Sequence, residues 1–98
     1  MLAKTRRLSA LEVRQVLAKG TPARKGGVSM RALAVATPGK AAMVVSSKVA
    51  KSATVRNRLR RKGYAALPDP LPRAHMVFFI QDPEFKTADI LSLCLTRS

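Results

Sequence analysis

The side chains best suited to binding chemistry in this sequence are positively charged and concentrated in one short segment. Seven cations fall within fifteen residues: Lys48, Lys51, Arg56, Arg58, Arg60, Arg61 and Lys62. No Asp or Glu occurs between Val13 and Pro68, so the neighbouring sequence offers these cations no ion-pair partner. Arginine presents a planar fork of donors that matches a phosphate group, and a merely solvated charged face would normally mix signs. The segment therefore predicts contact with a polyanion, with nucleic acid favoured over an anionic membrane surface.

Groups suited to catalysis are scarce in the same sequence. There is one histidine, His75, and one cysteine, Cys94, which excludes an internal disulfide and a multi-cysteine metal site. His75 opens an apolar run without a neighbouring nucleophile, and Cys94 lies between two leucines, as a small hydrophobic residue would. Gly26 and Gly27 lack the further Gly and Lys of a nucleotide-binding loop. We therefore predict no catalytic residue, and neither a metal nor a cofactor bound by the chain itself.

Length and composition fit one folded domain over residues 1–98. The 98 residues are 47% hydrophobic, which is too much for a disordered basic tail, and the formal net charge is +14. No apolar run approaches the ~20 residues of a membrane-spanning helix. Residues 1–20 are basic enough to suit a mitochondrial presequence, but they contain a well-formed helix start and we take them as part of the fold. We expect a cytoplasmic protein that does not contact a membrane.

The first half of the chain predicts a helix followed by two paired strands. A Ser-x-x-Glu capping box, with an apolar face after it, predicts a helix over residues 10–19. Its Pro and Gly content predicts a loop over residues 21–27. Small and β-branched residues indicate strands over residues 28–36 and 41–46. Pro followed by Gly between them predicts a type II turn that would pair these strands antiparallel.

The second half predicts a cationic helix and a buried strand. The apolar stripe of Val55 and Leu59 indicates a helix over residues 53–62, which the proline-rich segment 68–72 must end. Residues 75–80 form a short continuous apolar run, which is typical of a strand buried on both faces.

The last expected element is a helix opened by Asp82, Pro83 and Glu84. Its expected apolar face consists of Phe85, Ala88, Leu91 and Leu95. Together the elements predict an α+β fold of the two-layer sandwich type. In that fold a three- or four-stranded sheet would pack its helices mainly on one face.

Residues 46–51 and 55–61 together resemble the signature of the bacterial ribonuclease P protein subunit. In that family a strand ends in Ser-Lys-Lys-like residues and the next helix begins with Arg-Asn-Arg; here Ser47 replaces the first Lys. The resemblance implies a ribosomal-protein-like domain with a left-handed βαβ crossover, against the usual right-handed rule. It also implies a role in removing the 5′ leader of precursor tRNA. Ribonuclease P RNA and its Mg²⁺ ions would perform the cleavage, and no protein partner would be required.

The resemblance implies two sets of RNA-binding residues. Contacts with the catalytic RNA would fall to one helix, at Arg56, Asn57, Arg58, Arg60, Arg61 and Lys62. Lys48 and Lys51 would bind phosphate near the substrate. A leader cleft between the first helix and the sheet would be lined by Val13, Val16, Leu17, Val28 and Met30. The family often has Phe in the first helix where this chain has Val and Leu, so we expect leader binding that depends more on charge than on base stacking.

Two other functions fit the basic composition. A small structural RNA-binding protein, such as a ribosome-associated module, would bind RNA but would not accelerate leader cleavage by ribonuclease P RNA at low Mg²⁺. A non-specific DNA-compacting protein would use minor-groove arms or kinking wedges, for which the sequence has no pattern. The protein subunit of ribonuclease P is the first interpretation, and a reconstituted cleavage assay separates it from the ribosome-associated alternative.

Overall fold

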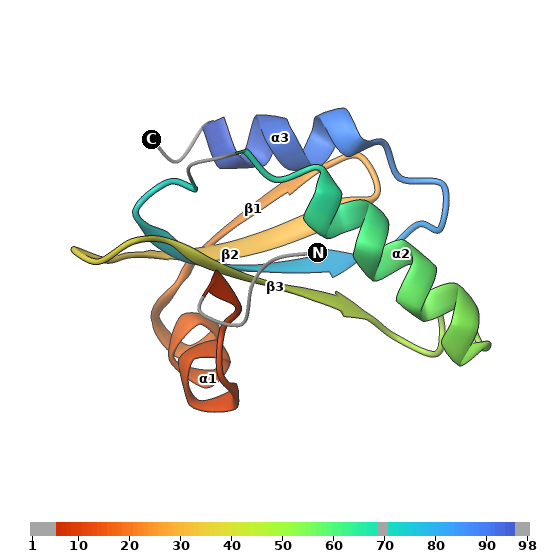
Figure 1. Cartoon of the computed structure of the whole chain (residues 1–98), viewed down its shortest axis with the longest axis horizontal. Coiled ribbons are helices and arrows are strands. Elements are labelled where there is room, and N and C mark those ends of the chain that lie inside the picture. Colours follow the sequence, from red (N-terminus) through yellow and green to blue (C-terminus); the bar gives the residue numbers. More distant parts are fainter. Residues whose placement is uncertain (1–5, 69–70, 96–98) are drawn as a thin grey trace.

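A four-stranded sheet forms the centre of the fold, with helices on both of its faces (Figure 1). The structure, a computed structural model, describes residues 6–68 and 71–95. The elements are α1 (Ala10–Lys19), β1 (Thr21–Lys25), β2 (Val28–Ala34), β3 (Lys40–Val45), α2 (Ala53–Ala65), β4 (Ala74–Ile80) and α3 (Thr87–Leu95). Asp69 and Pro70, in the proline-rich segment, lie outside the described residues, as do residues 1–5 and 96–98. The predicted α+β class is confirmed.

β4 is a central strand, as its continuous apolar run predicts. It pairs antiparallel with β2 and parallel with β3, which gives the sheet order β1-β2-β4-β3. Met76, Val77 and Phe78 are fully buried, so both faces of this strand are covered. Because β3 and β4 run parallel, α2 forms the crossover between them. The left hand implied for this crossover stays a prediction.

The predicted antiparallel pairing of β2 with β3 is wrong, because β4 lies between them. A type II turn at Pro38 and Gly39 requires a positive φ at the glycine, and in the described part of the chain Gly26 alone has one. The segment after β2 instead runs beside the residues that precede β4, where the Val35 N–H donates to the Arg73 carbonyl oxygen at 3.1 Å. β4 comes from later in the chain, and nothing in the sequence near β2 and β3 indicates that it lies between them. A prediction from local sequence therefore pairs β2 with β3.

The predicted loop over residues 21–27 is wrong as well, because its first five residues form the edge strand β1. β1 pairs antiparallel with β2 along its whole length. Pro22 is tolerated because an edge strand needs ladder hydrogen bonds on one side only. Gly26 turns the chain with a φ of 57°, a conformation that glycine adopts at little cost. The Pro and Gly signals therefore marked the edge and the turn of a β-hairpin.

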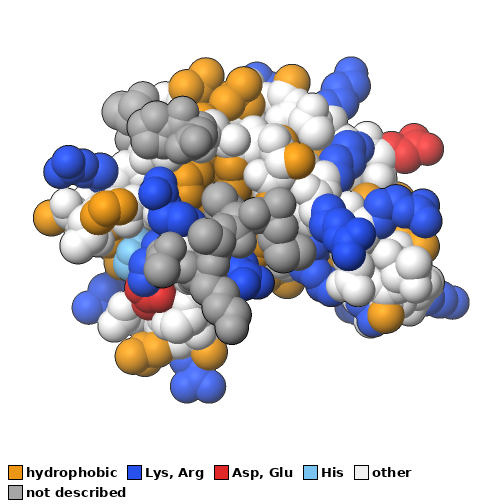
Figure 2. Space-filling view, viewed as in Figure 1, with side chains coloured by type: hydrophobic (Ala, Val, Ile, Leu, Met, Phe, Trp, Pro, Cys, Tyr) orange, Lys and Arg blue, Asp and Glu red, His pale blue; other side chains and the backbone are white. Residues whose placement is uncertain are grey.

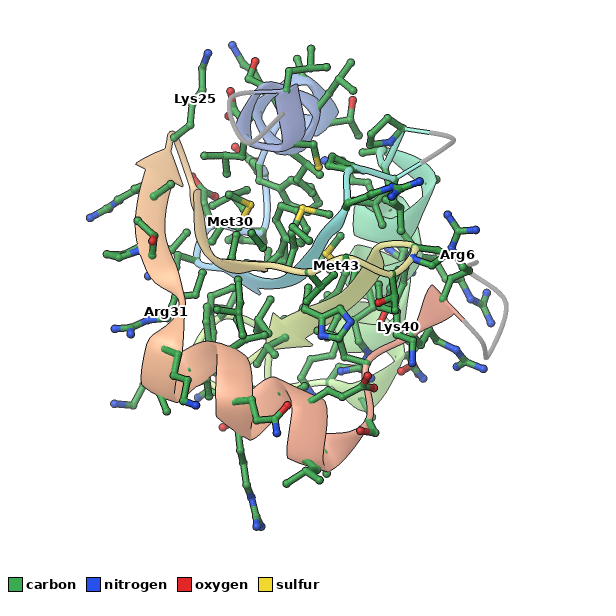
Figure 3. The ribbon with its side chains drawn as sticks, turned by 90° about the vertical axis from the view of Figure 1, so that its left-hand side faces the viewer. Arg6, Lys25, Met30, Arg31, Lys40 and Met43 are labelled. Carbon is green, nitrogen blue, oxygen red and sulfur yellow. The ribbon has the colours of Figure 1, made fainter. Side chains whose placement is uncertain are left out.

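The two faces of the sheet are covered unequally (Figure 1). α2 and α3 pack on one face over the main core, which includes Met30, Met43 and Phe78. α1 packs on the other face against β4 and β2. Figure 3 shows this division, with Met30 and Met43 on the α3 side of the sheet and Arg31 and Lys40 on the α1 side. α1 thus adds a partial layer to the expected two-layer arrangement.

Local contacts explain where α1 begins and why α2 continues past its expected end. α1 has the predicted bounds and capping box: Ser9 Oγ accepts from the Glu12 N–H at 3.2 Å, and the Glu12 carboxylate accepts from the Ser9 N–H at 2.9 Å. α2 continues past Gly63 to Ala65, beyond its expected end. A Cβ at Gly63 would lie 2.8 Å from the Met43 sulfur. The glycine therefore lets α2 approach the sheet closely instead of ending the helix.

α3 buries a different face from the one expected. Its buried residues are Ile90, Leu93 and Cys94. Leu91 is 39% exposed and Leu95 is 60% exposed, so the predicted face that contained them is wrong. Asp82 does not cap the helix; its carboxylate accepts from the Glu84 N–H in a turn, and α3 begins at Thr87. The later start changes which residues face the sheet.

Candidate nucleic-acid interface

One side of α2 presents polar and cationic side chains to solvent. Ser52 caps the helix by accepting from the Val55 N–H at 3.5 Å, and Leu59 and Gly63 are buried against the core. The solvent side carries an open groove of about 320 Å³ lined by Thr54, Asn57, Arg58 and Arg61. We call these four residues the α2 outer face. Figure 2 shows Lys and Arg side chains gathered over this helix.

Three of the six residues predicted to contact the catalytic RNA belong to the α2 outer face. Asn57, Arg58 and Arg61 are exposed, and within residues 6–68 and 71–95 no hydrogen bond or ion pair holds the Arg58 or Arg61 side chain. Arg60 is half-buried and donates to the Asn57 side-chain oxygen, which orients that amide. α2 contains no Asp or Glu, so its cations repel one another. An anion from outside would relieve that repulsion.

Arg56 turns back toward the chain that precedes the helix. Its Nη1 donates to the carbonyl oxygens of Ala50 and Lys51, at 2.9 and 2.8 Å. These carbonyls belong to the connection between β3 and α2, which carries both predicted phosphate-binding lysines. Lys48 and Lys51 are exposed on that connection. Arg56 therefore shapes the segment that presents the two lysines.

Lys62 does not extend onto the α2 outer face. Its Nζ donates to the Phe85 carbonyl oxygen at 2.5 Å and lies 4.3 Å from the centroid of the Phe85 ring. The ammonium group is thus engaged within the protein, and its placement gives no support to the predicted RNA contact.

A second concave surface lies on the α1 side of the sheet. Two cavities of about 420 and 210 Å³ adjoin at Ser29 and Phe79, which line both. Val44 is 37% exposed and, with half-buried Phe79, provides an apolar floor, while Arg31 borders the larger cavity. Arg31 Nη1 also donates to the Leu17 carbonyl oxygen, at 3.1 Å, near the C-terminal end of α1. We call Ser29, Arg31, Val44 and Phe79 the sheet-face cleft.

Three of the residues predicted to line the leader cleft are buried away from any ligand. Val28 and Met30 are fully buried in the core beneath α3, on the opposite face of the sheet. Successive strand residues alternate between faces, so a shift of one position replaces them by Ser29 and Arg31. Val16 is fully buried as well. The resemblance implied a cleft between the first helix and the sheet, but it did not show which face of each strand lines that cleft.

The two other predicted first-helix residues retain accessible surface: Leu17 is 38% exposed and Val13 is half-buried. The residues that sequence analysis missed are those of the sheet-face cleft. Alternating polar residues in β2 could have revealed Ser29 and Arg31, because apolar and polar positions take turns along that strand. Phe79 had no such signal, since β4 is apolar at nearly every position.

Charges at the N-terminal end of α1 are paired. Lys40 Nζ lies 3.1 Å from a Glu12 carboxylate oxygen, and His75 Nε2 lies 3.8 Å from the same oxygen. The hydrogen bond from the Ser9 backbone, followed by that from Lys40, lowers the pKa of Glu12 to about 2. The carboxylate therefore supports α1 and is a poor proton acceptor at neutral pH.

The single cysteine is placed in the core, where it is unreactive. Burial raises the pKa of the Cys94 thiol to about 11, so the group stays protonated at neutral pH. Across residues 6–68 and 71–95, no three His, Cys, Asp or Glu side chains come close enough together to hold a metal ion. None of the helices in those ranges has the length and apolar character needed to cross a membrane.

Fold and charge together define a small, basic α+β protein whose cations concentrate on one helix and the connection before it. The family model for Ribonuclease P matches residues 2–94, and the chain therefore belongs to the Ribonuclease P family. The solved structure of the Staphylococcus aureus RNase P protein is similar with a TM-score of 0.75, covering 96% of this chain and 92% of that one at 14% identity. At this identity the likeness shows the fold alone. None of the curated proteins matches the sequence.

Membership of this family makes the chain the protein subunit of ribonuclease P, a tRNA-processing holoenzyme, and a partner of ribonuclease P RNA. The family predicted from residues 46–51 and 55–61 is thereby confirmed. No comparison supports the alternative of a ribosome-associated protein.

Proposed function

We propose that this chain binds ribonuclease P RNA through the α2 outer face and the 5′ leader of precursor tRNA through the sheet-face cleft, in the cytoplasm. The observation that carries the proposal is the uncompensated charge of Arg58 and Arg61, which are exposed on a helix that has no acid.

The α2 outer face has the donors of a site for an RNA backbone. A hydrogen bond from a guanidinium group to a phosphate contributes about 1.5–3 kcal/mol, and the planar fork of arginine can make two in parallel. The N-terminal end of the helix adds positive potential from its backbone dipoles. Asn57, oriented by Arg60, is available to a sugar or base edge beside the phosphate. Because all these groups project from one helix, their backbone needs no ordering on binding, and the remaining cost is the rotamer freedom of the side chains.

The sheet-face cleft suits a single-stranded segment. Phe79 and Val44 offer apolar surface to unstacked bases, and stacking on an aromatic ring contributes about 1–3 kcal/mol per base. Arg31 borders the cleft from β2, and Lys48 lies on the connection that follows β3. With one aromatic ring among its residues, the cleft depends strongly on charge. This agrees with the expectation of leader binding that is more electrostatic than stacked.

Cleavage is proposed to be the work of the RNA subunit, with Mg²⁺ stabilising the charge that develops on phosphate oxygens. Mg²⁺ prefers carboxylate, phosphate and water oxygens. Among the described acids, Glu12 is already bonded to Ser9 and Lys40, while Asp82, Glu84 and Asp89 lie in and before α3. None of these acids lines the groove of the α2 outer face, and RNA phosphates are the better ligands. The chain's part is to bring the RNA subunit and the leader together.

Reconstituted cleavage tests this proposal. Leader removal by ribonuclease P RNA is measured at low Mg²⁺ with and without the chain, because protein cations then replace ions that screen phosphate repulsion. We expect faster cleavage when the chain is added, with the largest gain for precursors whose leader is long enough to reach the cleft. RNA binding without any acceleration would contradict the proposal and favour a structural RNA-binding role.

A further inference from the structure

Lys62 is a cation of α2 whose charged end is bonded within the protein. The Phe85 group that receives it lies 23 residues further along the chain, in the turn between β4 and α3, and the Phe85 side chain is 2% exposed. The carbonyl oxygen accepts one N–H of the ammonium group while the ring face lies 4.3 Å from Nζ. A compact ammonium suits both partners. The contact ties the last turn of α2 to the second half of the fold.

α2 has little apolar surface with which to fix its own orientation. Leu59 and Gly63 are its buried residues, and Val55 and Tyr64 pack partly against the core. Gly63 lets the backbone approach Met43 but contributes no side chain. The Tyr64 hydroxyl accepts from the Met43 N–H at 3.3 Å and ties the C-terminal end of α2 to β3, but the apolar stripe that packs against the core is narrow. Rolling of the helix about its axis would turn the α2 outer face away from its ligand, so a polar contact on one flank has an orienting effect.

Lys62 supplies such a contact through its bond to the Phe85 carbonyl oxygen. It lies one turn beyond Arg58, at the edge of the α2 outer face, and its side chain turns from there to the Phe85 carbonyl oxygen. At the other end of α2, Arg56 is bonded to the carbonyl oxygens of Ala50 and Lys51. Cations bonded within the protein therefore lie near both ends of α2, although Lys62 keeps exposed surface. Arg58 and Arg61, which no internal bond holds in the described residues, lie between them.

We propose that Lys62 is a positioning residue, which holds α2 against the Phe85 turn so that Arg58 and Arg61 face the RNA subunit, and which does not itself contact a phosphate. This inference rests on the proposed binding of RNA by the α2 outer face. It divides the cations of α2 into those that hold the helix in its orientation and those that bind RNA.

Acylation of lysines in the wild-type protein, read by mass spectrometry, tests this directly. We expect Lys62 to react slowly in the free protein and at the same rate in the complex with ribonuclease P RNA. Lys48, exposed on the β3–α2 connection and assigned to the substrate, is the internal control and should react fast until precursor tRNA joins the complex and protects it. Fast reaction of Lys62 that RNA suppresses would overturn the inference. Failure of precursor tRNA to protect Lys48 would count against the proposed interface, while slow and unchanged Lys62 would still support its internal bond.

A matched pair of variants, Lys62→Met and Arg61→Met, gives a second test through the salt dependence of RNA affinity. Lys62→Met should bind ribonuclease P RNA more weakly at every salt concentration, with the wild-type slope of log affinity against log salt. A lost phosphate contact reduces the magnitude of that slope by about 0.7–0.9, and we expect this reduction for Arg61→Met. A reduced slope or an unchanged affinity for Lys62→Met would overturn the inference. Wild-type slope and affinity for Arg61→Met would instead contradict the proposed function. If Lys62→Met fails to fold, the acylation result decides.

Discussion

α1 and α2 begin with the same kind of cap and then differ in charge. Ser9 and Ser52 each accept a hydrogen bond from the N–H three residues ahead. α1 places Glu12 in its first turn, where the helix dipole favours a negative charge, and Lys40 pairs with it. α2 has no acid in its first turn, and cations follow instead.

Under the proposed function, this difference separates a helix whose charges are paired within the protein from a helix whose charges are paired by RNA. The anion that stabilises the start of α1 is part of the chain, and its bonds to Ser9 and Lys40 are formed in the free protein. The corresponding position of α2 is left without an anion, at some cost in helix stability. An RNA phosphate would supply the missing charge. Under the proposed function, α2 gives up local stability in exchange for RNA binding.

The largest loss of RNA binding is expected from Arg58→Ala combined with Arg61→Ala, which reduces the charge difference between α2 and α1. Loss of two charge-assisted phosphate bonds, each about 1.5–3 kcal/mol, should weaken binding to ribonuclease P RNA by about a hundredfold or more. The free energy of unfolding should stay the same or rise slightly, because like charges are removed and alanine favours helix. Titration with the RNA subunit and thermal unfolding measure the two quantities.

Arg14→Ala combined with Lys19→Ala is the matched control, since both residues are exposed cations of α1 and the change in net charge is the same. We expect a much smaller loss of RNA affinity from this pair. Equal losses from the two pairs would mean that total charge, and not the placement of cations on α2, determines binding.

The next largest effect concerns the sheet-face cleft. Phe79→Ala should weaken binding of precursor tRNA by about 1–3 kcal/mol, roughly 5- to 150-fold, because a base loses its stacking surface. Binding of mature tRNA, which has no leader, should not change. Phe79→Leu keeps apolar bulk without the ring and should show most of the same loss. An equal loss for mature tRNA would contradict the assignment of the leader to this cleft.

A smaller effect is expected at the start of α1. Glu12→Ala removes half of the capping box and should lower the free energy of unfolding by about 1 kcal/mol at neutral pH. The pKa of Glu12 falls from its ordinary value of 4.5 to about 2 on folding, so the ionised group stabilises the folded chain. That contribution is complete above pH 4.5 and is lost as the pH falls toward 2. Wild type and variant should therefore converge in stability over this interval. A difference in unfolding free energy that stays constant down to pH 2 would contradict the stabilising role of the ionised Glu12 carboxylate.

The smallest effect is expected from a substitution that gives α2 a first-turn acid like that of α1. Thr54→Glu places an acid in the first turn of α2 and should raise the free energy of unfolding by about 0.3–1 kcal/mol. The same substitution puts a negative charge in the groove of the α2 outer face and should weaken RNA binding. Thr54→Gln is the uncharged control. If Thr54→Glu is more stable than Thr54→Gln and binds RNA equally well, stability and RNA binding are not in conflict at this position.

Prediction from sequence succeeds in this fold where the signal is local. The capping box sets both ends of α1 through neighbouring residues, and the apolar run of β4 marks a strand covered on both faces. The pairing of β2 with β4 depends on residues forty or more positions apart, for example Val28 opposite Ile80, and no local pattern carries it.

The candidate site shows the same division. A run of cations without acids identified α2, but residue type alone could not separate Lys62 from Arg61. That distinction depends on Phe85, whose carbonyl oxygen becomes a neighbour only after folding. The predicted and the proposed cleft differ by one strand position, because Val28 and Met30 belong to the packed face of β2 and the proposed cleft lies on the opposite face. Binding surfaces built on a sheet thus require the register, which the tertiary fold provides.

Crosslinking tests the central claim, that α2 and not α1 faces the RNA subunit, most directly. Thr54→Cys on α2 and Ala18→Cys on α1 each place a thiol at an exposed position for a photoreactive group. Native Cys94 is buried and has a raised pKa, so the introduced thiols react selectively. In the complex with ribonuclease P RNA alone, the account predicts strong crosslinks from position 54 and background from position 18. Crosslinks from position 18 as strong as those from position 54 would contradict it.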